Sequence, residues 1–145
     1  MTYDLERFVT AQDGTYGGVL DELRSGRKTG HWIWFVFPQV AGLGSSAMSQ
    51  YYAIGSLDEA RAYLAHPVLG SRLRECARIV LETQGRTPPE IFGPIDAMKV
   101  RSSMTLFGRA APDEPLFGQV LDRFYGGVAD ETTDARLVAW AKQPR

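Results

Sequence analysis

Apolar residues recur every three or four positions along most of this chain, which is the spacing of one face of an α-helix. Segments with this spacing are residues 5–9, 16–23, 57–64, 69–80, 116–124 and 137–140. No internal repeat and no linker interrupts them. The pattern therefore predicts an all-α fold, a compact multihelical bundle of many short helices in a single domain over residues 1–145.

The predicted helices have recognisable ends. Asp4 is a predicted N-cap of the first helix. Ser56 and Glu59 have the spacing of a capping box, in which each side chain accepts a hydrogen bond from the other residue's backbone N–H. The sequence at 87–90, Thr-Pro-Pro-Glu, repeats this spacing and adds a proline at the first helical position. Gly26 is expected to end the second helix in a left-handed conformation.

Residues 94–110 carry apolar positions on two opposite sides of a predicted helix. One side holds Ile95, Met98, Ser102, Thr105 and Leu106, and the other holds Ala97, Val100, Met104 and Phe107. A helix that rests on a protein surface needs only one apolar stripe. This segment is therefore predicted to be buried along both sides, as the central helix of the fold.

Large aromatic residues are concentrated between residues 32 and 37, in the sequence Trp-Ile-Trp-Phe-Val-Phe. This composition is typical of a buried β-strand. A strand needs a partner for its backbone N–H and C=O groups, and no convincing second strand is found in the sequence. We therefore expect a short helix or an extended segment packed among helices.

The composition is that of an ordinary globular protein. The chain has 145 residues, a net charge of −1 and a pI of about 6.1. Nucleic-acid binding is not expected, because it usually requires a surplus of Lys and Arg. The longest apolar run is far too short to span a membrane, and the N-terminus does not have the pattern of a signal peptide. A cytoplasmic location is the expectation.

The sequence contains no motif of a known metal, cofactor or catalytic site. Cys76 is the only cysteine, and it lies on an apolar helix face, so we expect a buried thiol. His31 and His66 are far apart and do not have the spacing of zinc ligands, while His66 precedes a proline and is expected to end a helix. No metal, no cofactor and no catalytic residue is therefore predicted, and whether the chain is an enzyme stays open.

Polar residues near the aromatic segment and on the central helix are candidates for a small-molecule site. The candidate binding residues are Gln12, His31, Trp32, Trp34, Gln39, Lys99 and Ser103. Tryptophan rings stack on planar ligands, and Lys99 can neutralise an anion. We expect a planar, anionic and nucleotide-like ligand, with His31 as the proton carrier if a reaction occurs. The alternative is a helical protein-interaction module in which these rings form a purely structural core.

Several motifs resemble an uncharacterised bacterial family called domain of unknown function 1810, sometimes labelled calpastatin-like. The motifs lie along nearly the whole chain, at residues 7–13, 31–39, 42–44, 66–73, 91–93 and 96–107. The chain looks like a mycobacterial member of this family. The resemblance implies a compact multihelical fold, but it implies no activity and transfers no catalytic residues.

Overall fold

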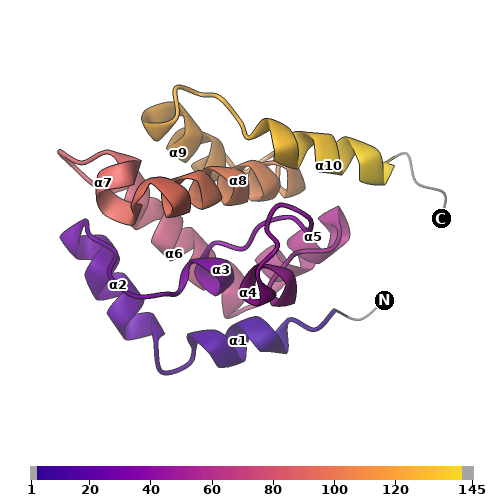
Figure 1. Cartoon of the computed structure of the whole chain (residues 1–145), viewed down its shortest axis with the longest axis horizontal. Helices are drawn as coiled ribbons and strands as arrows, with labels where there is room; N and C mark the ends of the chain where they lie inside the picture. Colours follow the sequence, from indigo (N-terminus) through magenta and orange to yellow (C-terminus); the bar gives the residue numbers. More distant parts are fainter. Residues whose placement is uncertain (1–2, 142–145) are drawn as a thin grey trace.

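The computed structural model describes residues 3–141, which form ten helices around one hydrophobic core (Figure 1). The helices are α1 (Glu6–Gln12), α2 (Tyr16–Ser25), α3 (Ile33–Val36), α4 (Ala47–Tyr51), α5 (Leu57–Ala65), α6 (Leu69–Glu82), α7 (Pro88–Phe92), α8 (Pro94–Ala110), α9 (Leu116–Phe124) and α10 (Glu131–Ala141). Extended pairing in this range is limited to one isolated parallel bridge between Val40 and Ile54. The predicted all-α class is confirmed.

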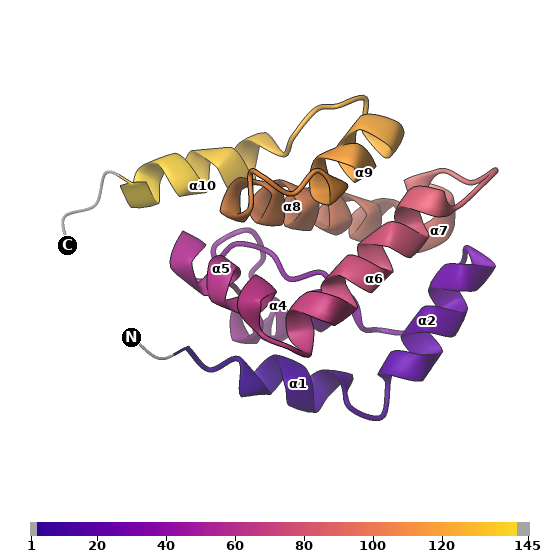
Figure 2. The ribbon, with the colours of Figure 1, turned by 180° about the vertical axis from the view of Figure 1, so that it is seen from behind.

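Helix α8 is the central element, as predicted. It lies between α9 and α10 on one side and α3 and α5 on the other, in both the front and the back view (Figures 1 and 2). Val100, Met104 and Phe107 are completely buried on one face, and Leu106 is completely buried on another. The helix begins with a proline, whose missing N–H costs nothing at this position.

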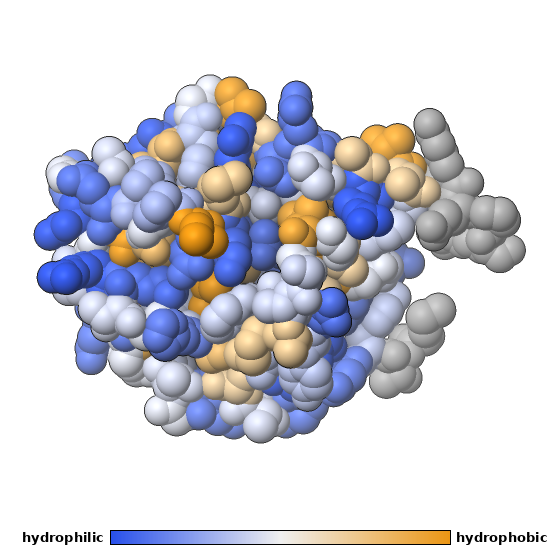
Figure 3. Space-filling model, in the orientation of Figure 1, coloured by the Kyte–Doolittle hydropathy of each residue, from blue (hydrophilic) through white to orange (hydrophobic). Residues whose placement is uncertain are grey.

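The predicted burial of the first turns of α8 is wrong on one side. Ile95 is 71% exposed and Met98 is 68% exposed. In the view of Figure 3, separate hydrophobic side chains, coloured orange, interrupt a mostly hydrophilic surface. The segment that leads into α10 packs along another part of α8. Arg101 donates hydrogen bonds to the backbone oxygens of Val128 and Ala129, and the Tyr125 hydroxyl donates to the Ala97 oxygen. The segment therefore packs along Ala97 and Arg101 and leaves the side chains of Ile95 and Met98 uncovered.

The aromatic segment forms the single-turn helix α3 rather than a strand. The backbone N–H of Val36 donates to the Trp32 oxygen and that of Phe37 to the Ile33 oxygen, so the segment satisfies these groups locally. Phe37 is completely buried and packs edge-on against Phe92, with ring centroids 6.0 Å apart. A short helix among helices was one of the two expected forms.

The helix ends agree only in part with the sequence analysis. Thr87 and Glu90 form the complete capping box predicted for α7, and Gly26 ends α2 with a φ of 73°. Ser56 accepts from the Glu59 N–H as expected, but the Glu59 carboxylate accepts from Gly55 instead. The predicted cap at Asp4 is wrong, because the residue before α1 is Leu5.

Helix α4 was not predicted from the sequence. It has five residues, too few for a helical spacing of apolar positions to be recognised, and none of its side chains is buried. None of the helices in the described range is long and apolar enough to cross a bilayer.

Candidate functional site

A carboxylate on the first turn of α8 is shared by two lysines. The Lys28 Nζ lies 2.8 Å from Asp96 Oδ2, and the Lys99 Nζ lies 3.6 Å from Asp96 Oδ1. Asp96 and Lys99 are one helical turn apart, so both side chains lie on the same face of α8. Two cations share one carboxylate, which leaves this group of three with one positive charge.

Each of these lysines also lies over a tryptophan ring. Lys28 Nζ is 5.1 Å from the ring centroid of Trp32, and Lys99 Nζ is 5.1 Å from that of Trp34. Both distances are within the range of a favourable cation–π interaction. We call Lys28, Trp32, Trp34, Asp96 and Lys99 the lysine–tryptophan cluster.

The two halves of the lysine–tryptophan cluster differ in their access to solvent. Trp32 is only 2% exposed and the side chain of Lys28 only 7%, so this half belongs to the core. Trp34 and Lys99 are half-buried. Only the Trp34–Lys99 half therefore presents an aromatic face and a cation to a molecule in solution.

Glu22 on α2 fixes the loop before Trp32. Its Oε1 accepts from the backbone N–H groups of Thr29 and Gly30, at 2.6 and 2.8 Å, and from the Trp32 Nε1 at 3.1 Å. Partial burial opposes ionisation, but these hydrogen bonds, from Gly30 first, outweigh it and lower the pKa of Glu22. Glu22 is thus a charged anchor that orients the Trp32 ring. A Cβ at Gly30 would meet Trp32 at 2.9 Å, so the loop needs glycine there.

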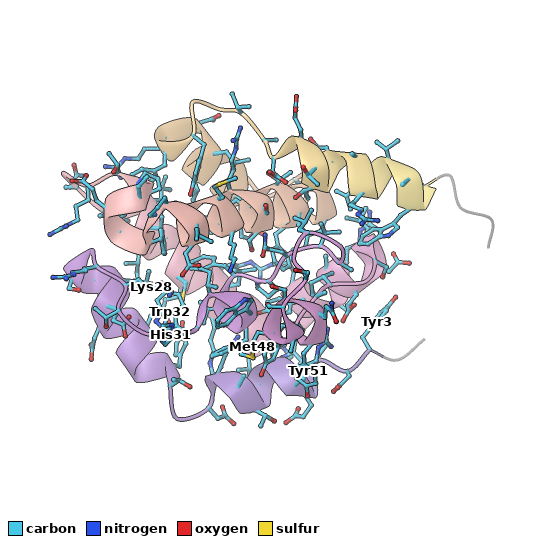
Figure 4. All side chains as sticks on the ribbon, viewed as in Figure 1. Tyr3, Lys28, His31, Trp32, Met48 and Tyr51 are labelled. Carbon is cyan, nitrogen blue, oxygen red and sulfur yellow. The ribbon has the colours of Figure 1, made fainter. Side chains whose placement is uncertain are left out.

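His31 and Ser103 lie in opposite environments. His31 is exposed, and it lies with Lys28 and Trp32 between α2 and α3 (Figure 4). Ser103 is one turn beyond Lys99 on α8 and is completely buried. Within residues 3–141 its hydroxyl has no hydrogen-bond partner. Buried hydroxyls of this kind are usually satisfied by a bound water or ligand.

The structure does not bring Gln12 to this surface. Its side chain is buried, and Nε2 donates to the Phe35 oxygen at 2.7 Å and to the Tyr63 hydroxyl at 3.2 Å. Arg72 donates to its Oε1 at 3.3 Å. Gln12 therefore links α1, α3, α5 and α6 inside the core.

Gln39 is half-buried and lies just before the single β-bridge. Its backbone oxygen accepts from the Ile54 N–H at 2.9 Å.

Two surface cavities lie away from the predicted binding residues. One of about 370 Å³ lies between the C-terminal ends of α2 and α6, next to Arg24 and Arg86. The other, of about 300 Å³, lies between α1 and the end of α4, next to Tyr51 and Tyr52. No group of three or more His, Cys, Asp or Glu side chains in the described range is placed to hold a metal ion.

Lys28 and Asp96 were not predicted from the sequence as members of the cluster. Two signals were present. Lys28 closely precedes the aromatic segment, and Asp96 is three residues before Lys99 on a predicted helix, which is the spacing of a helical ion pair. Chemically, the cluster and the neighbouring His31 offer an aromatic face, a cation and an accessible imidazole, which are groups suited to binding, and none of these residues is an activated nucleophile.

Comparisons with known proteins bear on the fold and the family of this chain. The crystal structure of the conserved hypothetical protein Rv1873 from Mycobacterium tuberculosis, at 1.38 Å, is similar to this chain, with 54% identity and a TM-score of 0.92. The alignment covers 94% of this chain and 97% of that one. A search of the curated proteins gave no significant match. Residues 2–137 match the family described as "Protein of unknown function (DUF1810)", and the chain therefore belongs to the DUF1810 family.

Proposed function

We propose that the chain binds a small planar anion, of nucleotide-like chemistry, at the lysine–tryptophan cluster. Trp34 provides the stacking face, and Lys99 neutralises the anionic group. The observation that carries the proposal is the position of Lys99, half-buried between the Trp34 ring and the Asp96 carboxylate.

The ion pair between Lys99 and Asp96 is weak enough for an anionic ligand to compete with Asp96 for Lys99. Its ion pair with Asp96 is long, at 3.6 Å, and Asp96 is already paired with Lys28 at 2.8 Å. A partly solvated helical pair of this kind contributes about 0.5 kcal/mol or less. Stacking of a base on an aromatic side chain is worth about 1–3 kcal/mol. An anion that pairs with Lys99 therefore gives up a weak ion pair, and its stacking energy on Trp34 matches or exceeds the roughly 0.5–1 kcal/mol of the Lys99 cation–π contact that it would displace.

Four further residues have roles in this proposal. Ser103 has a buried hydroxyl with no partner in the described part of the chain, and a ligand or a ligand-bound water would satisfy it. His31 is exposed beside Lys28 and Trp32, and in this proposal it would form a hydrogen bond with a part of the ligand that extends beyond Trp34 and Lys99. Gln39 is assigned a similar orienting role, whereas Gln12 supports α3 from the core through its bond to Phe35.

The test uses adenosine monophosphate as the probe, with adenosine and inorganic phosphate as its two halves. Lys99→Met should weaken binding of the monophosphate about tenfold, because a charge-assisted contact of about 1.5 kcal/mol is lost. Adenosine should bind Lys99→Met and the wild type equally. Isothermal titration measures both affinities, and a rise in melting temperature shows that the native state is bound.

Arg61→Met is the matched control, because it removes one positive charge from an exposed pair with Asp58 on α5. Trp34→Leu should abolish binding of adenosine, whereas Trp140→Leu on α10 should not. If Lys99→Met and Arg61→Met weaken the binding of adenosine monophosphate equally, this binding is non-specific and the proposed site is wrong. Absence of any effect of the monophosphate at millimolar concentration also refutes it.

One observation favours the alternative, a protein-interaction module. Ile95 and Met98 are neighbours on α8 and are both largely exposed, although apolar side chains of this size are usually buried. If this face binds a protein, a double substitution of Ile95 and Met98 by serine should abolish that binding and leave the melting temperature nearly unchanged. Binding of the monophosphate would be unaffected.

A further inference from the structure

The cavity between α1 and α4 has two tyrosine rings in its wall. It has a volume of about 300 Å³ and is lined by Tyr51, Tyr52, Asp4, Glu6, Arg7 and Thr10, among others. This is at the small end of the range for ligand sites. Tyr51 and Tyr52 meet edge to face, with ring centroids 4.8 Å apart. The cavity is therefore large enough for a small molecule that favours aromatic surfaces.

The two tyrosines are held at different depths. Tyr51 is 57% exposed. Tyr52 is half-buried, and its ring packs against Phe8 at 5.7 Å and against Phe35 at 5.4 Å. Tyr52 is thus fixed by the core, while the Tyr51 ring stands beside the N-terminal end of α1 (Figure 4). A wall of this kind exists before any ligand binds, so little ordering cost is expected.

Arg7 is the only cation among the described residues that line this wall, and its charge is already compensated. Its guanidinium pairs with Glu59 at 3.1 Å, and both side chains are about nine-tenths buried. It also donates to the backbone oxygens of Tyr51 and Ala53, each at 2.9 Å. Arg7 therefore positions the tyrosines and is not available to an incoming anion.

The two carboxylates of the cavity are not compensated in this way. Asp4 and Glu6 are both exposed, and no side chain of residues 3–141 pairs with their carboxylate oxygens. With Arg7 neutralised by Glu59, the cavity carries two negative charges beside two aromatic rings. Aromatic faces attract cations through their quadrupole, and nearby carboxylates add a Coulombic attraction.

We propose that the cavity formed by Tyr51, Tyr52, Asp4 and Glu6 binds an organic cation, with an alkylammonium or guanidinium group over the Tyr51 ring. The size of the cavity favours a low-molecular-mass amine over a bare metal ion, and two exposed carboxylates without a third ligand among the described residues make a poor metal site. This site is independent of the lysine–tryptophan cluster, which carries the opposite charge and lies on other elements of the fold.

The experiment is an amide NMR titration of the isotope-labelled full chain with agmatine, which has both an ammonium and a guanidinium group. Sodium chloride at equal ionic strength is the blank. Agmatine is expected to shift the amides of residues 4–11 and 51–53 with one saturable affinity, and sodium is not. Shifts spread evenly over all acidic surfaces would overturn the proposal, and so would the absence of any saturable shift.

Variants separate the aromatic contribution from the charge. Tyr51→Leu should weaken the binding of agmatine about fivefold or more, whereas Tyr51→Phe keeps the ring and should bind agmatine like the wild type. Glu6→Gln should weaken the binding of agmatine severalfold. Asp21→Asn, an equal change of charge at an exposed position on α2, should not. If Tyr51→Leu binds as tightly as Tyr51→Phe, or Asp21→Asn weakens binding as much as Glu6→Gln, the proposed site is wrong.

Discussion

Gly70 is the position at which one added methyl group should destabilise this protein most clearly. It lies in the first turn of α6, where that helix passes the end of α5. A Cβ at this position would lie 2.1 Å from the backbone oxygen of Leu64 and 2.9 Å from its carbonyl carbon, whereas ordinary contacts begin at 3.4 Å. The same oxygen accepts a hydrogen bond from Arg74 at 3.1 Å. Relief of the clash therefore requires the two helices to separate.

The magnitude follows from two opposing effects. Overpacking in a core usually costs about 1–3 kcal/mol, and a clash with backbone is at the upper end because no side-chain rotation relieves it. Alanine in place of glycine stabilises a helix by about 1 kcal/mol. The net expectation for Gly70→Ala is a loss of about 2 kcal/mol in the free energy of unfolding. For a chain of this length, that lowers the melting temperature by roughly 6 °C.

Gly118→Ala is the matched control. Gly118 lies within α9, is exposed, and has no atom within 4 Å of the added Cβ. The same chemical change should therefore stabilise the protein by up to about 1 kcal/mol. Urea unfolding followed by far-UV circular dichroism gives both free energies. If Gly70→Ala is as stable as Gly118→Ala, the close approach of α5 and α6 is not a constraint and the reasoning is refuted.

Three further predictions concern stability and reactivity. His66→Ala should lower the free energy of unfolding by about 1 kcal/mol, and His66→Asn by much less, because the His66 Nδ1 accepts from two backbone N–H groups at the start of α6. Urea unfolding measures both values, and equal losses would contradict this prediction. Arg7→Met should cost about 3 kcal/mol because it leaves the Glu59 carboxylate buried without its partner, whereas Arg61→Met at an exposed pair should cost less than about 1 kcal/mol. Burial raises the pKa of the Cys76 thiol to about 12, so the native protein should not react with a thiol reagent at about pH 8. The unfolded thiol ionises at a lower pH than the folded one, so the stability contributed by this group should fall as the pH rises from 9 towards 12. A thiol that reacts as fast in the native protein as in the unfolded protein would refute its burial.

Local signals in the sequence were reliable where a helix end depends only on its own residues. The capping box at Thr87 and the left-handed Gly26 formed as expected. The box at Ser56 formed only in part, because Gly55 and Arg7 bind the Glu59 carboxylate in the folded chain. Arg7 is far from Glu59 in the sequence, so no local pattern predicts this partner.

The candidate site shows the same division. The sequence indicated Trp34 and Lys99, because their residue types and their positions on predicted helices are visible in the chain. It did not indicate that Asp96 joins Lys28 to Lys99, since Lys28 and Asp96 are brought together only when the loop after α2 packs against α8. It grouped Gln12 with these residues, although the fold uses that amide inside the core.

The sequence by itself determined the helical class, the central position of α8, and a single-turn helix or extended form for the aromatic segment, because the spacing of apolar residues fixes which faces must leave water. Only the tertiary structure decided which stretch of α8 is covered, which charges meet, and where cavities remain. Ile95 and Met98 illustrate the physical reason. Their pattern indicates a buried face, but burial needs a neighbouring element, and the segment that leads into α10 packs along Ala97 and Arg101 and leaves these two side chains uncovered.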